Sequence, residues 1–87
     1  MEIRIDPHTL ERAEERGTSR AEIEDVVKNG FPIPAKRDRL GKARIYEFKQ
    51  EWLGKHYEQK RIEVIYILEE EVVVTVTVYV FYGKWEG

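Results

Sequence analysis

The period of apolar and polar residues changes several times along the chain, and each period predicts one element. At the start, Ile3 and Ile5 alternate with charged residues, which is the period of two that is typical of a short strand. Asp6 then suits a helix N-cap, and Pro7 suits the first helical position because its missing N–H is not needed there. A first helix is therefore predicted over residues 7–16.

A second helix is predicted over residues 19–29, after a very short turn. Gly17 accepts the left-handed conformation that ends a helix, and Ser19 with Glu22 three residues later forms the pattern of a capping box. The apolar stripe of this helix consists of Ile23, Val26 and Val27. Because the turn is so short, the two helices should form a tight hairpin or corner.

The second half of the chain has the composition of a β-sheet. Residues 31–42, "FPIPAKRDRLGK", carry prolines and a glycine among basic residues and predict a mobile surface loop. Three β-branched and aromatic blocks follow, separated by "EWLG" and "EEE": "ARIYEFKQ", "KHYEQKRIEVIYIL" and "EVVVTVTVYVFY". The predicted fold class is α+β, with a short N-terminal strand and two helices packed on a three- to four-stranded antiparallel sheet in the order βααβββ.

The last strand predicts two different faces. By alternation, one face holds Val72, Val74, Val76, Val78 and Val80, and we expect it to meet the helices. The other face holds Thr75, Thr77, Tyr79 and Phe81. This second face is open to two interpretations, an ordinary β surface or the floor of a shallow cleft that offers hydroxyl groups and an aromatic plane.

Length and composition limit the kinds of protein that this chain can be. Its 87 residues are enough for one domain, 1–87, and it contains no cysteine. No metal-ligand spacing, phosphate-binding glycine loop or nucleophile motif is present, so neither a metal nor a cofactor is expected. No apolar run reaches the roughly 20 residues of a membrane span, and the first residues do not resemble a signal peptide. We therefore expect a cytoplasmic protein that does not contact a membrane.

Charge is distributed unevenly along the chain. Residues 36–61 hold nine basic and four acidic side chains, a balance of +5, whereas the remainder has six basic and thirteen acidic side chains, a balance of −7. One interpretation is a surface rich in ion pairs. The other is a basic stripe that attracts the phosphates of RNA. Its candidate RNA-binding residues are Lys36, Arg37, Arg39, Lys42 and Arg44.

The stretch "PHTLERAEERG" places His8, Arg12 and Arg16 four residues apart on one side of the first predicted helix. Glu11 and Glu15 lie beside this stripe and suit ion pairs with the arginines, so a solvated helix face explains the pattern. An anion-binding or catalytic edge explains it as well. In the first turn the helix dipole disfavours a charged imidazole, which suits His8 to the role of general base.

The pattern His8-x3-Arg12-x3-Arg16-Gly17, followed by "TSRAEIEDVVKNG", a basic loop and a last strand with "VVVTVTVY", resembles a widespread family of small domains of unknown function. Those domains look like relatives of RelE-type interferases and other metal-independent ribonuclease toxins. The resemblance implies a RelE-like fold. The site residues it implies are His8, Arg12, Arg16, Thr77 and Tyr79, with Arg44 or Tyr46 from the first strand of the meander.

The first functional hypothesis is therefore an RNA-binding domain, whose catalytic form is a metal-independent endoribonuclease. In that form His8 acts as acid or base, Arg12, Arg16 and Arg44 hold the phosphate, and Thr77 or Tyr79 orients the ribose hydroxyl. The chain departs from such toxins in two respects. Its net charge is −2 where they are strongly basic, and its terminal "YGKWEG" has no histidine.

The second hypothesis is a protein-interaction module without catalysis. It is either the partner of an antitoxin-like protein or a homodimer. The residues that favour it are aromatic side chains near the ends of elements, which often anchor interfaces: Phe31, Trp52, Phe81 and Trp85. A third hypothesis is a structural domain without a site.

Overall fold

The computed structural model describes residues 1–85 and consists of one sheet with two helices. Along this part of the chain the elements are β1 (Ile3–Arg4), α1 (Pro7–Arg16), α2 (Arg20–Asn29), β2 (Phe31–Ile33), β3 (Leu40–Trp52), β4 (Lys55–Glu69) and β5 (Val72–Gly83). The strands lie in the order β1-β5-β4-β3-β2. The predicted α+β fold is confirmed. The sheet has five strands and is mixed, because β1 runs parallel to β5.

Both helices begin and end where local chemistry predicts. The Asp6 side chain accepts a hydrogen bond from the His8 N–H at 2.8 Å, and Gly17 ends α1 with a φ of 86°. The Ser19 side chain accepts from the Glu22 N–H at 3.3 Å, which is one half of the expected capping box. The Glu22 carboxylate does not return to Ser19, because it binds a buried lysine instead, as described below.

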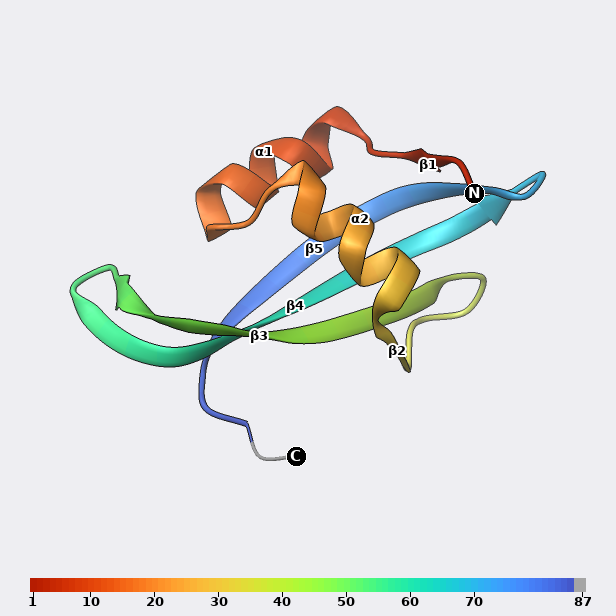
Figure 1. Cartoon of the computed structure of the whole chain (residues 1–87). Helices are drawn as coiled ribbons and strands as arrows, with labels where there is room; N and C mark the ends of the chain where they lie inside the picture. Colours follow the sequence, from red (N-terminus) through yellow and green to blue (C-terminus); the bar gives the residue numbers. More distant parts are fainter. Residues whose placement is uncertain (86–87) are drawn as a thin grey trace.

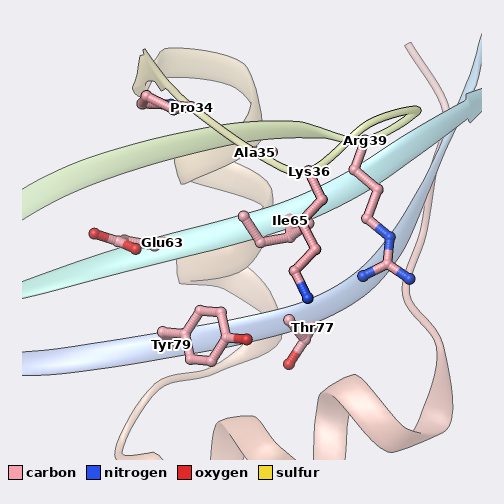
Figure 2. Close-up of a pocket in the computed structure, with 8 residues that line it drawn as sticks. All are labelled: Pro34, Ala35, Lys36, Arg39, Glu63, Ile65, Thr77 and Tyr79. Atoms are coloured by element: carbon pink, nitrogen blue, oxygen red, sulfur yellow. The ribbon is translucent and has the colours of Figure 1, made fainter.

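The two helices cover one face of the sheet, with α1 along β5 and α2 over β3 and β4 (Figure 1). Between the helices and the sheet lies the core, which consists of Ile5, Ala13, Ile23, Val26, Val27, Ile62, Val64, Tyr66, Val73 and Val78. The opposite face carries no helix within residues 1–85, and we call it the open face. The loop of residues 34–39 lies along part of it (Figure 2).

The expectation of an irregular loop over residues 31–42 is wrong at both ends. Residues Phe31–Ile33 form β2, which pairs with Gly41–Ala43 of β3 in antiparallel register. Pro32 is tolerated because β2 is at the edge of the sheet, where a strand needs hydrogen bonds on one side only. The irregular part is therefore limited to residues 34–39.

A β-bulge in β5 corrects the predicted division of its two faces. Ile65 pairs with Thr77, but Tyr66 pairs with Thr75, so Val76 is an extra residue on β5. An extra residue reverses the alternation. Before the bulge, Val73 and Thr75 face the helices, so Val72 and Val74 lie on the open face and not in the core as predicted. After the bulge the expectation holds, since Val78 and Val80 face the core, and Thr77, Tyr79 and Phe81 lie on the open face.

The hairpin turn between β4 and β5 has an unfavourable sequence. Its two central residues, Glu70 and Glu71, have φ values of 49° and 70°. Positive φ at both positions is typical of a type I′ turn, which favours Asn-Gly. The equivalent turn between β3 and β4 has Leu53 and Gly54, with φ values of 51° and 84°.

Replacing Glu70 with Asn and Glu71 with Gly should stabilise the protein. The new residues adopt positive φ with less strain, and we expect the free energy of unfolding to rise by about 1 kcal/mol. Urea denaturation measures this change. Glu69→Gln removes a carboxylate next to the turn without changing its backbone and controls for charge. An equal gain in Glu69→Gln would show that charge repulsion, and not φ, limits stability there.

Candidate functional site

The end of α1 is held on the sheet by hydrogen bonds to its last carbonyl groups. The Tyr82 hydroxyl donates to the Arg16 carbonyl oxygen at 2.6 Å, and the Lys60 ammonium donates to that of Gly17 at 3.0 Å. Lys60 is buried, and its charge is paired with Glu22 at 2.8 Å. Burial, followed by the nearby charge of Glu22, raises the pKa of Tyr82 to about 12, so its hydroxyl remains a donor at neutral pH. Aromatic rings of Phe48, Trp52 and Tyr57 surround Tyr82.

Arg16 reaches from the end of α1 around the edge of the sheet. Its guanidinium donates a hydrogen bond to the Val78 carbonyl oxygen of β5. The same guanidinium lies 5.5 Å from the centre of the Tyr79 ring, which belongs to the open face. The structure therefore brings together two residues that the sequence analysis assigned to one site, Arg16 and Tyr79.

A hollow of about 250 Å³ lies next to Tyr79 on the open face (Figure 2). The residues lining it are Pro34, Ala35, Lys36, Arg39, Glu63, Ile65, Thr77 and Tyr79. Lys36 and Arg39 come from the loop of residues 34–39 and extend over β5, where Thr77 and Tyr79 present their hydroxyl groups (Figure 2). Two cations, two hydroxyl groups and one carboxylate therefore line this space, and Arg16 lies against the Tyr79 ring. The cations outnumber the carboxylate, so the space is suited to an anion.

Two residues of this region were missed by the sequence analysis. Glu63 lines the hollow, and Arg61 is bonded to it, with Nε 2.9 Å from Oε2. The alternation in "KRIEVIY" contained the signal, because Arg61 and Glu63 must share the face opposite Ile62 and Val64.

The open face is also aromatic. Phe31, Tyr79 and Phe81 lie on it and are 42%, 42% and 46% exposed. Tyr79 and Phe81 are stacked at a centroid distance of 6.4 Å, and the Arg61 guanidinium lies 5.3 Å from the centre of the Phe31 ring. Flat apolar rings flanked by cations are therefore available to a ligand beside the hollow.

His8 and Arg12 lie outside this cluster. The His8 side chain is 88% exposed in the first turn of α1, and its Nδ1 is 3.9 Å from Glu11. Arg12 lies 3.5 Å from Glu15. Within residues 1–85 neither side chain lines the hollow, so at these two residues the solvated helix face describes the structure.

The remaining predicted RNA-binding residues also lie away from the hollow. Arg37 is exposed in the loop but is not among the lining residues. Lys42, Arg44 and Tyr46 are on the side of β3 that faces the helices, since their partners in register are core positions of β4 or Lys60. Arg44 and Tyr46 both donate hydrogen bonds to Asp25 of α2, the arginine at 2.7 Å.

The Asp25 cluster is a structural link between α2 and β3. Hydrogen bonds from Tyr46 and Asn29, together with the Arg44 charge, hold the pKa of Asp25 below its ordinary value of 3.8. Burial and the bond to Asp25 raise the pKa of Tyr46. Arg44 and Tyr46 therefore contribute to helix docking, on the opposite face from the hollow.

A second and larger hollow of about 500 Å³ lies beside the turn between β4 and β5. Arg4, Glu69, Glu70 and Val72 line it. Two carboxylates against one guanidinium give it no net attraction for an anion.

Nowhere in residues 1–85 do three or more His, Cys, Asp or Glu side chains lie together so as to hold a metal ion. No helix in the same part is long and apolar enough to cross a membrane.

Fold and site define a class of protein, a small α+β domain whose sheet is covered by helices on one face and has, on the other, a hollow lined by Lys36, Arg39, Glu63 and two hydroxyl groups. More particularly, the chain belongs to the DUF4258 family, a domain of unknown function whose family model matches residues 5–80. No curated protein and no solved structure matches the chain. The predicted family of small domains of unknown function is thus confirmed, and its likeness to RelE-type toxins stays a prediction.

Gly17→Ala should release the end of α1 from the sheet. A Cβ on Gly17 would overlap the Tyr82 hydroxyl and lie 3.0 Å from the Trp52 ring, and the φ of 86° is itself strained for alanine. We expect the free energy of unfolding to fall by about 3 kcal/mol. Gly54→Ala is the matched control, because Gly54 has a φ of 84° with open space around it, and it should cost about 1 kcal/mol. Equal losses in the two variants would contradict the close contact.

Asp25→Asn should make the free energy of unfolding less dependent on pH in the acidic range. A carboxylate with a lowered pKa stabilises the fold above its ordinary pKa, and this contribution is lost as pH falls through the lower pKa of the folded state. The wild type should therefore lose stability steeply below about pH 4. The variant should be less stable at pH 7 but lose less on acidification, as measured by thermal unfolding at pH 7 and pH 3. Glu24→Gln, on the same helix, should keep the wild-type slope.

Proposed function

We propose that the chain binds single-stranded RNA on the open face of its sheet, with a backbone phosphate in the hollow. One observation carries this proposal. Side chains from two separate segments, the loop of residues 34–39 and β5, bring two cations and two hydroxyl groups together there, and Arg16 of α1 lies against the Tyr79 ring. Cations and hydroxyl donors are the groups that proteins use most to contact nucleic-acid phosphates.

The charge of the hollow supports a phosphate ligand. Lys36 and Arg39 line it, and the Arg61 charge nearby is balanced by Glu63. The loop of residues 34–39 belongs to the basic part of the chain, although the net charge of the whole is −2. A local excess of cations is sufficient to attract a polyanion, since charges more than about 10 Å away are largely screened at physiological salt.

The exposed aromatic rings support a single strand over a duplex. Phe31, Tyr79 and Phe81 offer flat faces beside the hollow, and stacking of an unpaired base on an aromatic ring contributes about 1–3 kcal/mol. Bases in a duplex are stacked inside the helix and do not reach such rings. The combination of a phosphate hollow and stacking surfaces is therefore suited to unpaired nucleotides.

The catalytic form predicted from the sequence assigns acid or base chemistry to His8. In the part of the chain that the structure describes, the ion-pair partner of His8 is Glu11, and the hollow is lined by other residues. Cleavage by His8 therefore stays a prediction. It requires His8→Ala to abolish cleavage of RNA in the presence of a chelator.

A second candidate function is association with another protein, and the same exposed rings favour it. Of the four aromatic residues named from the sequence, Phe31 and Phe81 are exposed on the open face. Trp52 is stacked on Tyr82 at 5.0 Å, and the Trp85 N–H donates to Gln59. Light scattering tests for a homodimer, and co-purification with an antitoxin-like partner tests for a complex. A dimer that Phe81→Ser dissociates would favour this function.

The cytoplasmic location that the sequence predicts stays a prediction.

Lys36→Gln combined with Arg39→Gln should weaken RNA binding and its dependence on salt. We expect about tenfold lower affinity for a fluorescent single-stranded RNA, measured by anisotropy. The slope of log affinity against log salt should become shallower by about 0.7 for each phosphate that the variant no longer neutralises. Arg20→Gln combined with Lys28→Gln makes the same change of charge on exposed residues of α2 and serves as the control. Equal losses in both double variants, or no binding by the wild type, would refute the proposed function.

A further inference from the structure

Glu63 is the one carboxylate among the residues described as lining the hollow. It lies on β4, between β3 and β5 in the sheet, and its side chain is 21% exposed. Arg61, on the same face, donates from Nε to its Oε2 at 2.9 Å. Tyr79 is the partner of Glu63 in register on β5, so the two side chains are direct neighbours across the strands.

A carboxylate is an unexpected residue in a hollow that attracts anions. It repels a bound phosphate, and its partial burial removes some of its hydration. The ion pair with Arg61 offsets the repulsion, but a glutamine at this position would bind a phosphate with no repulsion at all. The side chain therefore suits a chemical step on the phosphate better than it suits binding, because an ionised carboxylate accepts a proton.

We propose that Glu63 is the general base of a metal-independent cleavage of single-stranded RNA in the hollow, an inference that rests on the proposed function. Glu63 takes the proton of a ribose 2′-hydroxyl, whose oxygen forms a bond to the adjacent phosphorus. The bond from phosphorus to the 5′ oxygen breaks, and that oxygen leaves with the electron pair and takes a proton from the Lys36 ammonium. The products are a 2′,3′-cyclic phosphate and a 5′-hydroxyl, so the step balances without a further reactant.

The arrangement of the two proton-transfer groups fits this reaction. In an in-line displacement the attacking and leaving oxygens are on opposite sides of the phosphorus, so base and acid must be on opposite sides as well. Figure 2 shows the Lys36 amine beyond the hydroxyl end of the Tyr79 side chain and the Glu63 carboxylate toward the other end, directed along β4 away from the amine. A phosphate above the Tyr79 hydroxyl would lie between them.

The other groups of the hollow have matching roles. Arg39, which lines the hollow, and Arg16, at the Tyr79 ring, are placed to stabilise the negative charge that develops on the phosphate oxygens. The hydroxyl groups of Thr77 and Tyr79 donate to the phosphate or the ribose. The nucleophile is the 2′-hydroxyl, so the substrate is RNA and not DNA. The backbone must rotate into line, which an unpaired strand does more readily than a duplex.

The test separates cleavage from binding by using two forms of one RNA. A labelled single-stranded RNA reports cleavage in the presence of EDTA, and its 2′-O-methyl form, which lacks the nucleophile, reports binding by anisotropy. Glu63→Gln should reduce the cleavage rate at least 100-fold without weakening the affinity for the methylated RNA, which should stay equal or rise because the repulsion by the carboxylate is removed. Mass spectrometry should find a 2′,3′-cyclic phosphate on the wild-type product. Glu58→Gln, which changes a β4 carboxylate that is not among the residues lining the hollow, should cleave at the wild-type rate.

Glu63→Asp keeps the carboxylate on a shorter side chain and guards against a folding defect, which circular dichroism detects. It should retain measurable cleavage, more than Glu63→Gln. If the wild type binds the methylated RNA but leaves the cleavable RNA intact, or if Glu63→Gln cleaves as fast as the wild type, the inference is overturned while the proposed function stands. Loss of cleavage in His8→Ala alone would transfer the role of base to His8. No binding of the methylated RNA by the wild type would overturn both.

Discussion

The close approach of Gly17 to Tyr82 is the contact on which the rest of this structure depends. Because Gly17 has no side chain, the Tyr82 hydroxyl reaches the carbonyl of Arg16, and Lys60 reaches the carbonyl of Gly17. These bonds hold the end of α1 on β4 and β5. From there the Arg16 side chain crosses the sheet edge to the Tyr79 ring, so contacts on the helix-covered face place a cation against one of the side chains that line the hollow.

The bulge at Val76 is the second constraint. It lets Thr75 turn toward the helices, where its hydroxyl donates to Thr9 at 3.1 Å and accepts from the Asp6 N–H at 3.0 Å. Beyond the bulge, Thr77 and Tyr79 face the other way. A single extra residue therefore gives β5 a buried polar anchor for α1 and, two residues later, a hydroxyl-bearing surface on the open face.

The two faces of the sheet divide the charged residues of the chain into two kinds. On the helix-covered face, Lys60 and Arg44 have carboxylate partners on α2, and these pairs hold the layers together. On the open face, Lys36 and Arg39 line a hollow. The basic segment predicted from the sequence is therefore not one surface, because the loop carries Lys36 and Arg39 over the open face whereas Lys42 and Arg44, two residues apart on β3, share the helix-covered face.

Local interactions made much of the fold predictable from the sequence. The bounds of α1 follow from Asp6, Pro7 and Gly17, and the meander follows from β-branched blocks between turn residues, since caps and turns act within a few residues. The sequence also identified Arg16 and Tyr79 as candidate site residues, through the resemblance. It did not place Arg44 and Tyr46 in a helix-docking cluster, nor Glu63 in the hollow.

The sequence by itself thus determined the helices and strands, their order along the chain and the types of side chain that each of them carries. Only the tertiary structure decided which of those side chains meet. The bulge, the pairing of β2 with β3 and the docking of α1 on β5 are contacts between residues far apart in the chain, and no local period encodes them. A shift of one residue in such a contact moves a side chain to the opposite face of the sheet, which is why the candidate site became defined only in three dimensions.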